Sequence, residues 1–229
     1  MRALLRDVFE LLLPAICAAC AKAVEPGRSL CATCDRALPR FSGEAPPLLP
    51  ASIECAAATC YEGAVSDWMR RFKYPKRGFA GLDPAAQSVL RGWILEAAER
   101  TAGARPELVI PVALHSRRLR ERGFNPAALL AGALARNAGF RHDPTALIRI
   151  RDTPSQTGLD RRARRRNVEG AFCARGDLEG VTRVWLVDDV VTTGSTAAAA
   201  ARALTCRGVR SITVVCAART PLPALEAIS

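Results

Sequence analysis

Positions 184–196 read VWLVDDVVTTGST, and this stretch decides the fold that we expect. Its first four residues are apolar and predict a strand buried on both faces, as in a parallel sheet. Asp188 and Asp189 follow at the carboxyl end of that strand, where open α/β sheets bind ligands. A turn of hydroxyl residues around Gly194 then opens into a helix that we expect from about Ser195 to Cys206.

This turn has the chemistry of a phosphate site beside a sugar site. Backbone N–H groups at a helix N-terminus attract anions, and Thr and Ser hydroxyls add donors. Because carboxylates repel phosphate, Asp188 and Asp189 suit the hydroxyls of a sugar or a hydrated magnesium ion. Phosphate, diol and metal together describe a phosphorylated ribose. The alternative is an ordinary helix after a strand, with two incidental acids.

The remaining periodicity predicts alternating helices and strands. We expect helices over 64–72, 84–102 and 126–137, and strands over 108–112, 146–150 and 211–217. The helix at 126–137 has the clearest boundaries, because Asn125 can cap it, Pro126 suits its first position and Gly139 lies just past its end. Such alternation predicts an α/β fold around a mostly parallel sheet flanked by helices.

The composition excludes several classes of protein. The chain has 229 residues, of which 49% are hydrophobic and 24% charged, so it is neither disordered nor collagen-like. The run from Leu11 to Ala21 is broken by Pro14, and we expect residues 1–13 to form an amphipathic helix. We therefore expect a cytoplasmic protein without a membrane span.

The net charge is +11, and only three of the 33 basic residues are lysines (Lys22, Lys73 and Lys76). Arginine's planar fork suits phosphate, so the excess fits a polyanionic ligand. The bias of a GC-rich genome would also explain it.

Four of the nine cysteines form two CxxC pairs: Cys17 and Cys20, then Cys31 and Cys34. Two such pairs can surround Zn²⁺ with four sulfurs, and the ten-residue spacer is long enough to fold back as a hairpin. The site would be structural, because it leaves no position for water. The alternatives are a redox pair, which needs one CxxC, and disulfides, which need an export signal.

The other cysteines carry no such pattern. Cys55 and Cys60 are read as buried small side chains or as remnants of a second cluster, and Cys173, Cys206 and Cys216 as core residues. A stretch rich in Pro, Ser and Gly from 35 to about 50 predicts a linker. We accordingly expect a cysteine module with its linker at 1–50 and a larger domain at 51–229.

The stretch at 188–196 closely resembles the 5-phosphoribosyl-1-pyrophosphate (PRPP) binding motif of type I phosphoribosyltransferases. Other segments resemble the ComF/GntX (ComFC-like) family of that superfamily: the four-cysteine module, the residues RRLRERGFN at 117–125, and a flexible-loop pattern with QTGL at 156–159 and RRRNV at 164–168. Pro126 stands where that family usually has glutamine, and the family's second cysteine cluster is reduced to Cys55 and Cys60. The resemblance covers nearly the whole chain.

The resemblance implies a set of roles. Asp188 and Asp189 would bind the ribose hydroxyls and act as the catalytic acids, and Arg117 and Arg118 would take the pyrophosphate. The PRPP loop would comprise Asp188, Asp189, Val190, Thr192, Thr193, Gly194, Ser195 and Thr196. The flexible loop would contribute Gln156, Arg161 and Arg164. Mg²⁺ would accompany PRPP, and Zn²⁺ would be structural.

Two functions follow from the resemblance. The first is an enzyme that transfers a phosphoribosyl group from PRPP to an unidentified nitrogenous acceptor. The second is a DNA-handling protein that keeps the fold as a sensor or scaffold, because ComF relatives are linked to natural transformation and the uptake of single-stranded DNA. DNA-uptake or recombination proteins would then be its partners.

Two basic segments fit either function. Residues 149–166 hold seven arginines, which can close over pyrophosphate or bind nucleic acid non-specifically. The second segment interleaves aromatic and basic residues: Arg70, Arg71, Phe72, Lys73, Tyr74, Lys76, Arg77 and Phe79. It suits stacking of bases or, alternatively, a half-buried helix end with solvated charges.

Overall fold

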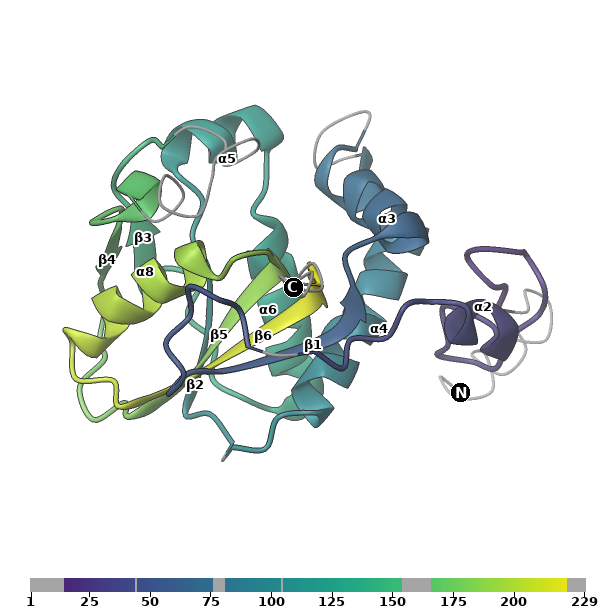
Figure 1. Ribbon diagram of the computed structural model, residues 1–229. Coiled ribbons are helices and arrows are strands. Elements are labelled where there is room, and N and C mark those ends of the chain that lie inside the picture. The colour runs from purple at the N-terminus through teal and green to yellow at the C-terminus, as the bar shows by residue number, and fades with distance from the viewer. Residues whose placement is uncertain (1–14, 44, 76–80, 104, 154–165, 222–229) are drawn as a thin grey trace, which may run out of the picture.

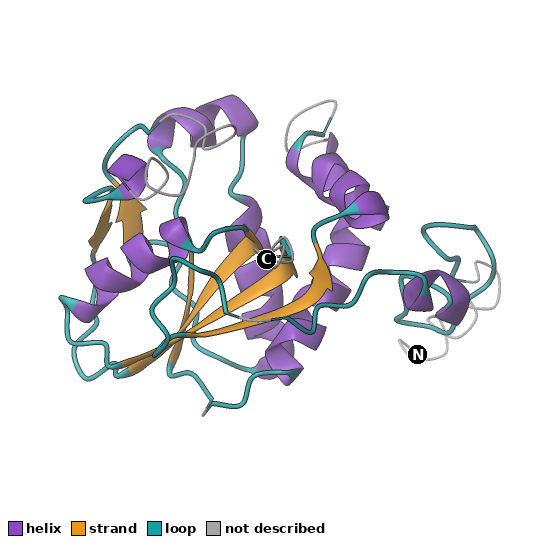
Figure 2. Ribbon diagram, in the orientation of Figure 1, coloured by secondary structure: helices purple, strands orange, loops and turns teal. Residues whose placement is uncertain are grey.

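A four-stranded parallel sheet forms the centre of the molecule in the computed structural model, which describes residues 15–43, 45–75, 81–103, 105–153 and 166–221 (Figures 1 and 2). The strand order is β1-β6-β5-β2, and every neighbouring pair is parallel. These strands are β1 (Glu54–Cys60), β2 (Leu108–Pro111), β5 (Arg183–Val191) and β6 (Ser211–Arg219). The expectation of a mostly parallel sheet flanked by helices is confirmed.

Helices cover both faces of this sheet. One face packs against α4 (Pro84–Glu99) and α6 (Pro126–Ala138), and the other against α8 (Ser195–Thr205). A two-stranded antiparallel ribbon of β3 (Leu147–Arg149) and β4 (Phe172–Ala174) packs on α8. Because both faces are covered, β5 and β6 are buried along most of their length, which explains their continuous apolar runs.

The helix boundaries follow from local chemistry. The Asn125 side chain accepts a hydrogen bond from the Ala127 N–H at 3.1 Å, and Gly139 ends α6 in a left-handed conformation with φ 71°. Asp83 caps α4 by accepting from the Ala86 N–H at 3.0 Å. The predicted helices at 126–137 and 84–102 are confirmed to within a few residues.

Four elements were not predicted, among them the short helix α2 (Ala32–Arg36). β1 contains three consecutive alanines, which have low strand propensity, and it is a strand because it pairs with β6. β4 spans only three residues. Residues 116–122, for which no helix was expected, form helix α5 (Ser116–Arg122), which ends at Gly123 with φ 82°.

Two helices stand beyond the carboxyl ends of the strands. α3 (Gly63–Lys73) and α5 lie on either side of that end of the sheet (Figure 1). Each begins shortly after a strand, α3 after β1 and α5 after β2. The ends of β5 and β6 therefore lie between two helices that carry basic side chains.

The cysteine module lies to one side of the sheet and contains the short helix α2 (Ala32–Arg36) (Figure 1). Arg40 connects the module to α4, because it forms ion pairs with Asp35 of the module at 2.7 Å and with Glu96 of α4 at 2.6 Å. The predicted amphipathic helix at 1–13 lies outside the described residues, as do Gln156, Arg161, Arg164, Lys76, Arg77 and Phe79.

Candidate functional site

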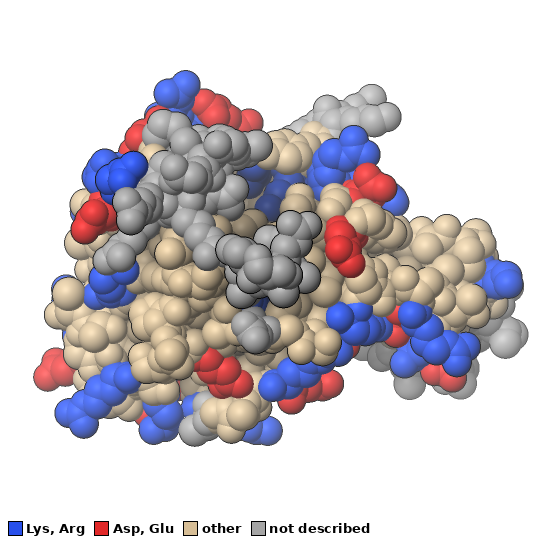
Figure 3. Space-filling model, viewed as in Figure 1, with Lys and Arg blue, Asp and Glu red and all other residues tan. Residues whose placement is uncertain are grey.

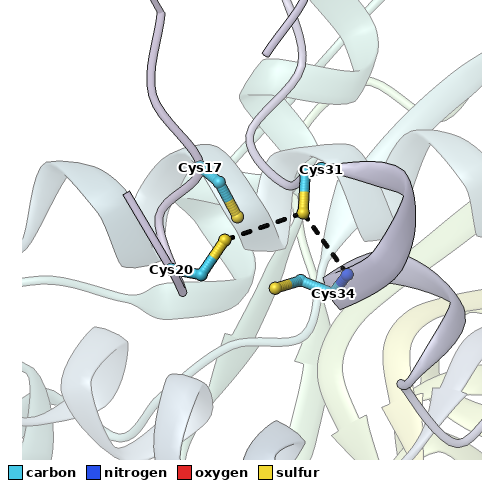
Figure 4. Close-up of side chains that lie close together, drawn as sticks. All are labelled: Cys17, Cys20, Cys31 and Cys34. Carbon is cyan, nitrogen blue, oxygen red and sulfur yellow. Dashed lines mark hydrogen bonds between the residues drawn. The ribbon is translucent and has the colours of Figure 1, made fainter. Parts of the chain in front are cut away.

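The two CxxC pairs converge in space. The Sγ atoms of Cys17, Cys20, Cys31 and Cys34 all lie within 4.8 Å of one another, and those of Cys20 and Cys31 are 3.7 Å apart (Figure 4). Four sulfurs at about 2.3 Å from one metal ion would be separated by about 3.8 Å, so the donor set fits a tetrahedral ion. The cluster can hold a metal such as zinc.

Local hydrogen bonds build the cluster. The Cys17 N–H donates to the Lys22 carbonyl at 2.7 Å, and the Cys34 N–H donates to the Cys31 sulfur at 3.5 Å, where Cys31 caps α2. The chain turns back around the first CxxC pair, with an antiparallel bridge between Ile16 and Ala23, and the Ala18 N–H donates to the Ser29 carbonyl at 2.9 Å at the far end of the spacer.

The protonation of the cluster shows why it suits a cation. Desolvation opposes ionisation of Cys17, but neighbouring backbone N–H groups outweigh it and lower the pKa of this thiol to about 6. Contacts with the Cys20 and Cys31 sulfurs, together with desolvation, raise the pKa of Cys34 to about 12. Four thiolates can share this volume only around a positive ion.

At the second candidate site, β5 continues through both acids instead of ending at Val187, so Asp188 and Asp189 are strand residues. Successive residues of a strand point to opposite faces. Asp189 is only 8% exposed and faces α3, where it meets Lys73. The Asp188 side chain turns back to the Asp189 N–H, and its charge acts on both Lys73 and Arg149 of β3.

Both carboxylates are fixed by the backbone. The Asp189 N–H donates to Asp188 Oδ1 at 2.9 Å, and the Val190 N–H donates to Asp189 Oδ1 at 2.8 Å. Burial, and then the charge of Asp189, raise the pKa of Asp188 well above its ordinary value. The surroundings of Asp188 therefore oppose the loss of its proton.

The hydroxyl turn follows directly. Gly194 precedes α8 with φ 83°, a left-handed conformation that favours glycine. The Thr193 hydroxyl donates to the Ser195 hydroxyl at 3.3 Å, so two side chains of the predicted PRPP loop lie together. Thr192 and Thr196 are half-buried, whereas Ser195 is buried.

The supposed linker covers this turn. The Leu48 N–H donates to the Thr193 carbonyl at 2.9 Å. A Cβ atom at Gly194 would lie 2.8 Å from the Pro46 Cβ and 3.1 Å from the Leu49 Cβ. Residues 46–49, called the strap below, thus hold the turn in place, although the sequence indicated irregular coil here.

Arg117 and Arg118 of α5 line a cavity of about 390 Å³, together with Glu121, Asp152 and Thr153. Arg117 pairs with Glu121 at 3.0 Å and with Asp152 at 3.3 Å, and these acids raise its pKa. Arg118 donates to the Thr153 carbonyl at 3.5 Å. Figure 3 shows basic side chains at this end of the molecule, over α5 and α3 and in the hollow between them.

Arg149 joins the arginine cavity to the acids and was missing from the predicted site. Burial, then the charge of Arg118, lower the pKa of its guanidinium, while Asp188 and Asp152 oppose that change. It donates to the Thr153 hydroxyl, and its Nε atom is buried without a hydrogen-bond partner among the described atoms. A half-buried cation thus contacts Thr153, which lines the arginine cavity.

The contact of Lys73 with Asp189 was also missed, because the sequence indicated that Lys73 is part of a base-stacking segment or, alternatively, a solvated charge at a half-buried helix end. Its Nζ lies 3.0 Å from Asp189 Oδ2, and its side chain is only 21% exposed.

The aromatic residues of the basic and aromatic segment at 70–79 differ in their exposure to solvent. Phe72 is buried and makes an edge contact with Phe124 at 6.2 Å between centroids, so it cannot stack on a base. Tyr74 is 66% exposed and lies under the Arg122 guanidinium at 5.0 Å. Among the described residues of this segment, Tyr74 is the exposed ring.

The remaining cysteines differ from one another. Cys216 is buried as expected, but Cys173 and Cys206 are exposed, so the prediction that they belong to the core is wrong. Cys173 points outward from the edge ribbon, and Cys206 follows the last turn of α8. Cys55 and Cys60 are half-buried on β1.

Comparisons with known proteins give relatives of two names. The chain is 34% identical over 208 residues to the DNA utilization protein YhgH of Salmonella typhimurium, covering 90% of each chain. The protein of that name from Escherichia coli K12 is 32% identical over 213 residues, again 90% of each. Competence protein F of Haemophilus influenzae is 38% identical over 111 residues, about half (48%) of either chain. No model of a known protein family matches.

Solved structures give a weaker likeness. Glutamine PRPP amidotransferase from B. subtilis, complexed with ADP and GMP, aligns with a TM-score of 0.41 and 18% identity. The alignment covers 64% of this chain but only 30% of that one.

No helix in the described part of the chain is long and apolar enough to cross a bilayer.

Proposed function

Because the chain belongs to the family of the DNA utilization protein YhgH and competence protein F, we propose that it is a PRPP-binding protein that serves the use of incoming DNA. The relatives' names supply the DNA context, and the carboxyl edge of the sheet supplies the ligand chemistry. The observation that carries the proposal is the placement of the acid pair and the hydroxyl turn: Asp188 and Asp189 lie near the carboxyl end of β5, and the turn that follows leads directly into the start of α8.

This arrangement assigns a part of the ligand to each group. The hydroxyl turn, Thr192–Thr196, offers donors to the 5′-phosphate at the start of α8. Asp188 and Asp189 accept hydrogen bonds from the ribose hydroxyls. Arg117 and Arg118 face the pyrophosphate from α5, with the guanidinium fork matched to phosphate oxygens.

Transfer of the phosphoribosyl group is the reaction that this site would catalyse. As the bond from the anomeric carbon to pyrophosphate breaks, positive charge grows on the sugar and negative charge on the leaving group. Asp188 and Asp189 would stabilise the first, and Arg117, Arg118 and Arg149 the second. The described residues do not identify the acceptor base.

Magnesium has little room on the protein itself. Asp189 Oδ2 is paired with Lys73, and one oxygen of each acid accepts a backbone N–H. The acids therefore do not fit a metal that binds them directly, and we expect any Mg²⁺ to arrive on the ligand's own pyrophosphate.

Zinc is the metal that we propose for Cys17, Cys20, Cys31 and Cys34. Bound there, Zn²⁺ would supply a structural cross-link between the two CxxC turns and leave no open position for catalysis. Residues 1–50 would then form a metal-stabilised module beside a ligand-binding domain at 51–229, in a cytoplasmic protein.

A second candidate function is binding of single-stranded DNA by a catalytically silent protein. Exposed Tyr74 under Arg122, together with the net charge of +11, favours it. Binding of this kind weakens as salt rises, because counterions are released from the phosphates.

Two measurements separate these functions. Pyrophosphate release from PRPP, assayed across a panel of nitrogenous bases, is expected for a transferase; silence with every acceptor would leave PRPP as a regulatory ligand. Single-stranded DNA affinity is expected to fall in Tyr74→Ala but not in Arg91→Ala, which removes an exposed cation of α4. Equal affinity of both variants would remove Tyr74 from the DNA surface.

A further inference from the structure

Lys73 places a nearly buried ammonium group on one of the two sugar-binding acids. The Nζ atom lies 3.0 Å from Asp189 Oδ2, and the two side chains are 21% and 11% exposed. Because both side chains are mostly shielded from water, the attraction between the two charges is stronger than in an ion pair on the surface.

The fold fixes the position of Lys73. It is the last residue of α3, whose buried face consists of Val65, Trp68, Met69 and Phe72. Phe72, the preceding residue, packs edge-on against Phe124, which lies between α5 and α6. The end of α3 is thereby held against the turn before α6, which fixes the backbone of Lys73 within reach of Asp189.

Three of the four carboxylate oxygens of the acid pair are engaged by the protein. Backbone N–H groups donate to Asp188 Oδ1 and to Asp189 Oδ1 at 2.9 and 2.8 Å. Lys73 holds the third, Asp189 Oδ2. Mg²⁺ requires near-ideal octahedral geometry and usually binds proteins through one or two carboxylates, so this pair is poorly arranged to receive it.

The charges around the acid pair also indicate that the site can bind its ligand without Mg²⁺. Two ionised acids would repel a ligand that carries phosphate at one end and pyrophosphate at the other. Burial opposes the charge on Lys73, but Asp189 and Asp188 outweigh it and raise the pKa of its ammonium. Lys73 therefore stays positive and cancels one carboxylate, while the raised pKa of Asp188 weakens the other negative charge.

We propose that Lys73 is a positioning residue that takes the electrostatic place of a divalent cation, so that the site binds a sugar phosphate without a metal ion. This inference rests on the proposed function, because it concerns the same ligand. Asp189 is held by Lys73 with its remaining lone pairs directed at the sugar hydroxyls.

Calorimetric titration with ribose 5-phosphate tests the inference, because this probe lacks the pyrophosphate that would carry its own metal. The wild-type protein is expected to bind it in EDTA, supplied together with its zinc complex so that the cysteine cluster keeps its metal, with a Kd within about threefold of the Kd in Mg²⁺. Lys73→Met should raise the Kd in EDTA by about tenfold or more, the loss of one charge-assisted contact, and Mg²⁺ should restore part of it. Arg91→Met, which removes an exposed cation of α4, is the matched control and should bind like the wild type.

The outcomes distinguish this inference from the proposed function. If the wild type binds ribose 5-phosphate only with Mg²⁺, or if Lys73→Met binds equally well in EDTA, the role of Lys73 is refuted while the ligand stands. If the wild type binds neither ribose 5-phosphate nor PRPP under either condition, the proposed function itself fails. The wild-type comparison needs no variant, so it holds even if Lys73→Met does not fold.

Discussion

Replacement of Gly194 by alanine probes the turn that we assign to the 5′-phosphate. Gly194 has φ 83°, and a left-handed conformation costs an L-residue roughly 1–2 kcal/mol. The new Cβ would also lie 2.8 Å from the Pro46 Cβ and 3.2 Å from the Leu49 backbone nitrogen. Because a proline ring and a backbone atom cannot rotate away, the strap must move, at a cost of about 1–3 kcal/mol.

Gly208→Ala is the matched control. Gly208 has φ 93° but nothing within 4 Å of its Cβ position, so this variant carries the backbone cost alone. Gly194→Ala should therefore be less stable than Gly208→Ala by about 1–3 kcal/mol, or roughly 2–10 °C in Tm for a chain of this size. Thermal and urea unfolding measure the difference, and binding of ribose 5-phosphate should weaken in Gly194→Ala alone. Equal stability of the two variants would refute the close packing of the strap on the turn.

Three further predictions follow from the sites. Asp188 has a raised pKa in the folded chain, so its contribution to stability is present at low pH and is lost as pH rises through that pKa; Asp188→Asn should gain on the wild type in urea midpoint between pH 5 and pH 8, and an unchanged gap would contradict this. Arg118→Ala should weaken the binding of PRPP about 10- to 100-fold and the binding of ribose 5-phosphate far less. Arg120→Ala, on the same helix, should change the affinity for neither ligand. Equal losses of affinity for both ligands would show that Arg118 does not hold the pyrophosphate. Cys31→Ser should abolish the zinc that metal analysis finds in the wild type and should lower Tm by roughly 5–10 °C. Cys206→Ser, which changes an exposed cysteine, should leave both the zinc content and the Tm unchanged. Full zinc content in Cys31→Ser would argue against the four-sulfur site.

Periodicity and capping residues predicted much of the fold. The apolar strands of the sheet centre and the boundaries of α6 followed from local rules: buried parallel strands are continuously apolar, and an Asn-Pro start with a Gly end defines a helix. The two CxxC pairs predicted the sulfur cluster, because a tight turn fixes two ligands at once.

Tertiary contacts decided the rest. β1 is a strand because β6 pairs with it, which its alanines do not signal. The strap looked like a linker because Pro and Gly mark irregular chain, yet its hydrogen bond to Thr193 and its contact with Gly194 depend on residues almost 150 positions away. Lys73 and Arg149 escaped notice because a single basic residue has no pattern, and only the fold shows that each meets an acid of β5.

Titration of the full chain with PRPP by calorimetry tests the central claim most directly, with Asp188→Asn/Asp189→Asn as the paired variant. We expect saturable binding by the wild type and none by the double variant, which keeps the shape of both side chains and removes their charge. Binding of equal strength in both proteins, or no heat from either, would contradict a sugar-phosphate site at the end of β5.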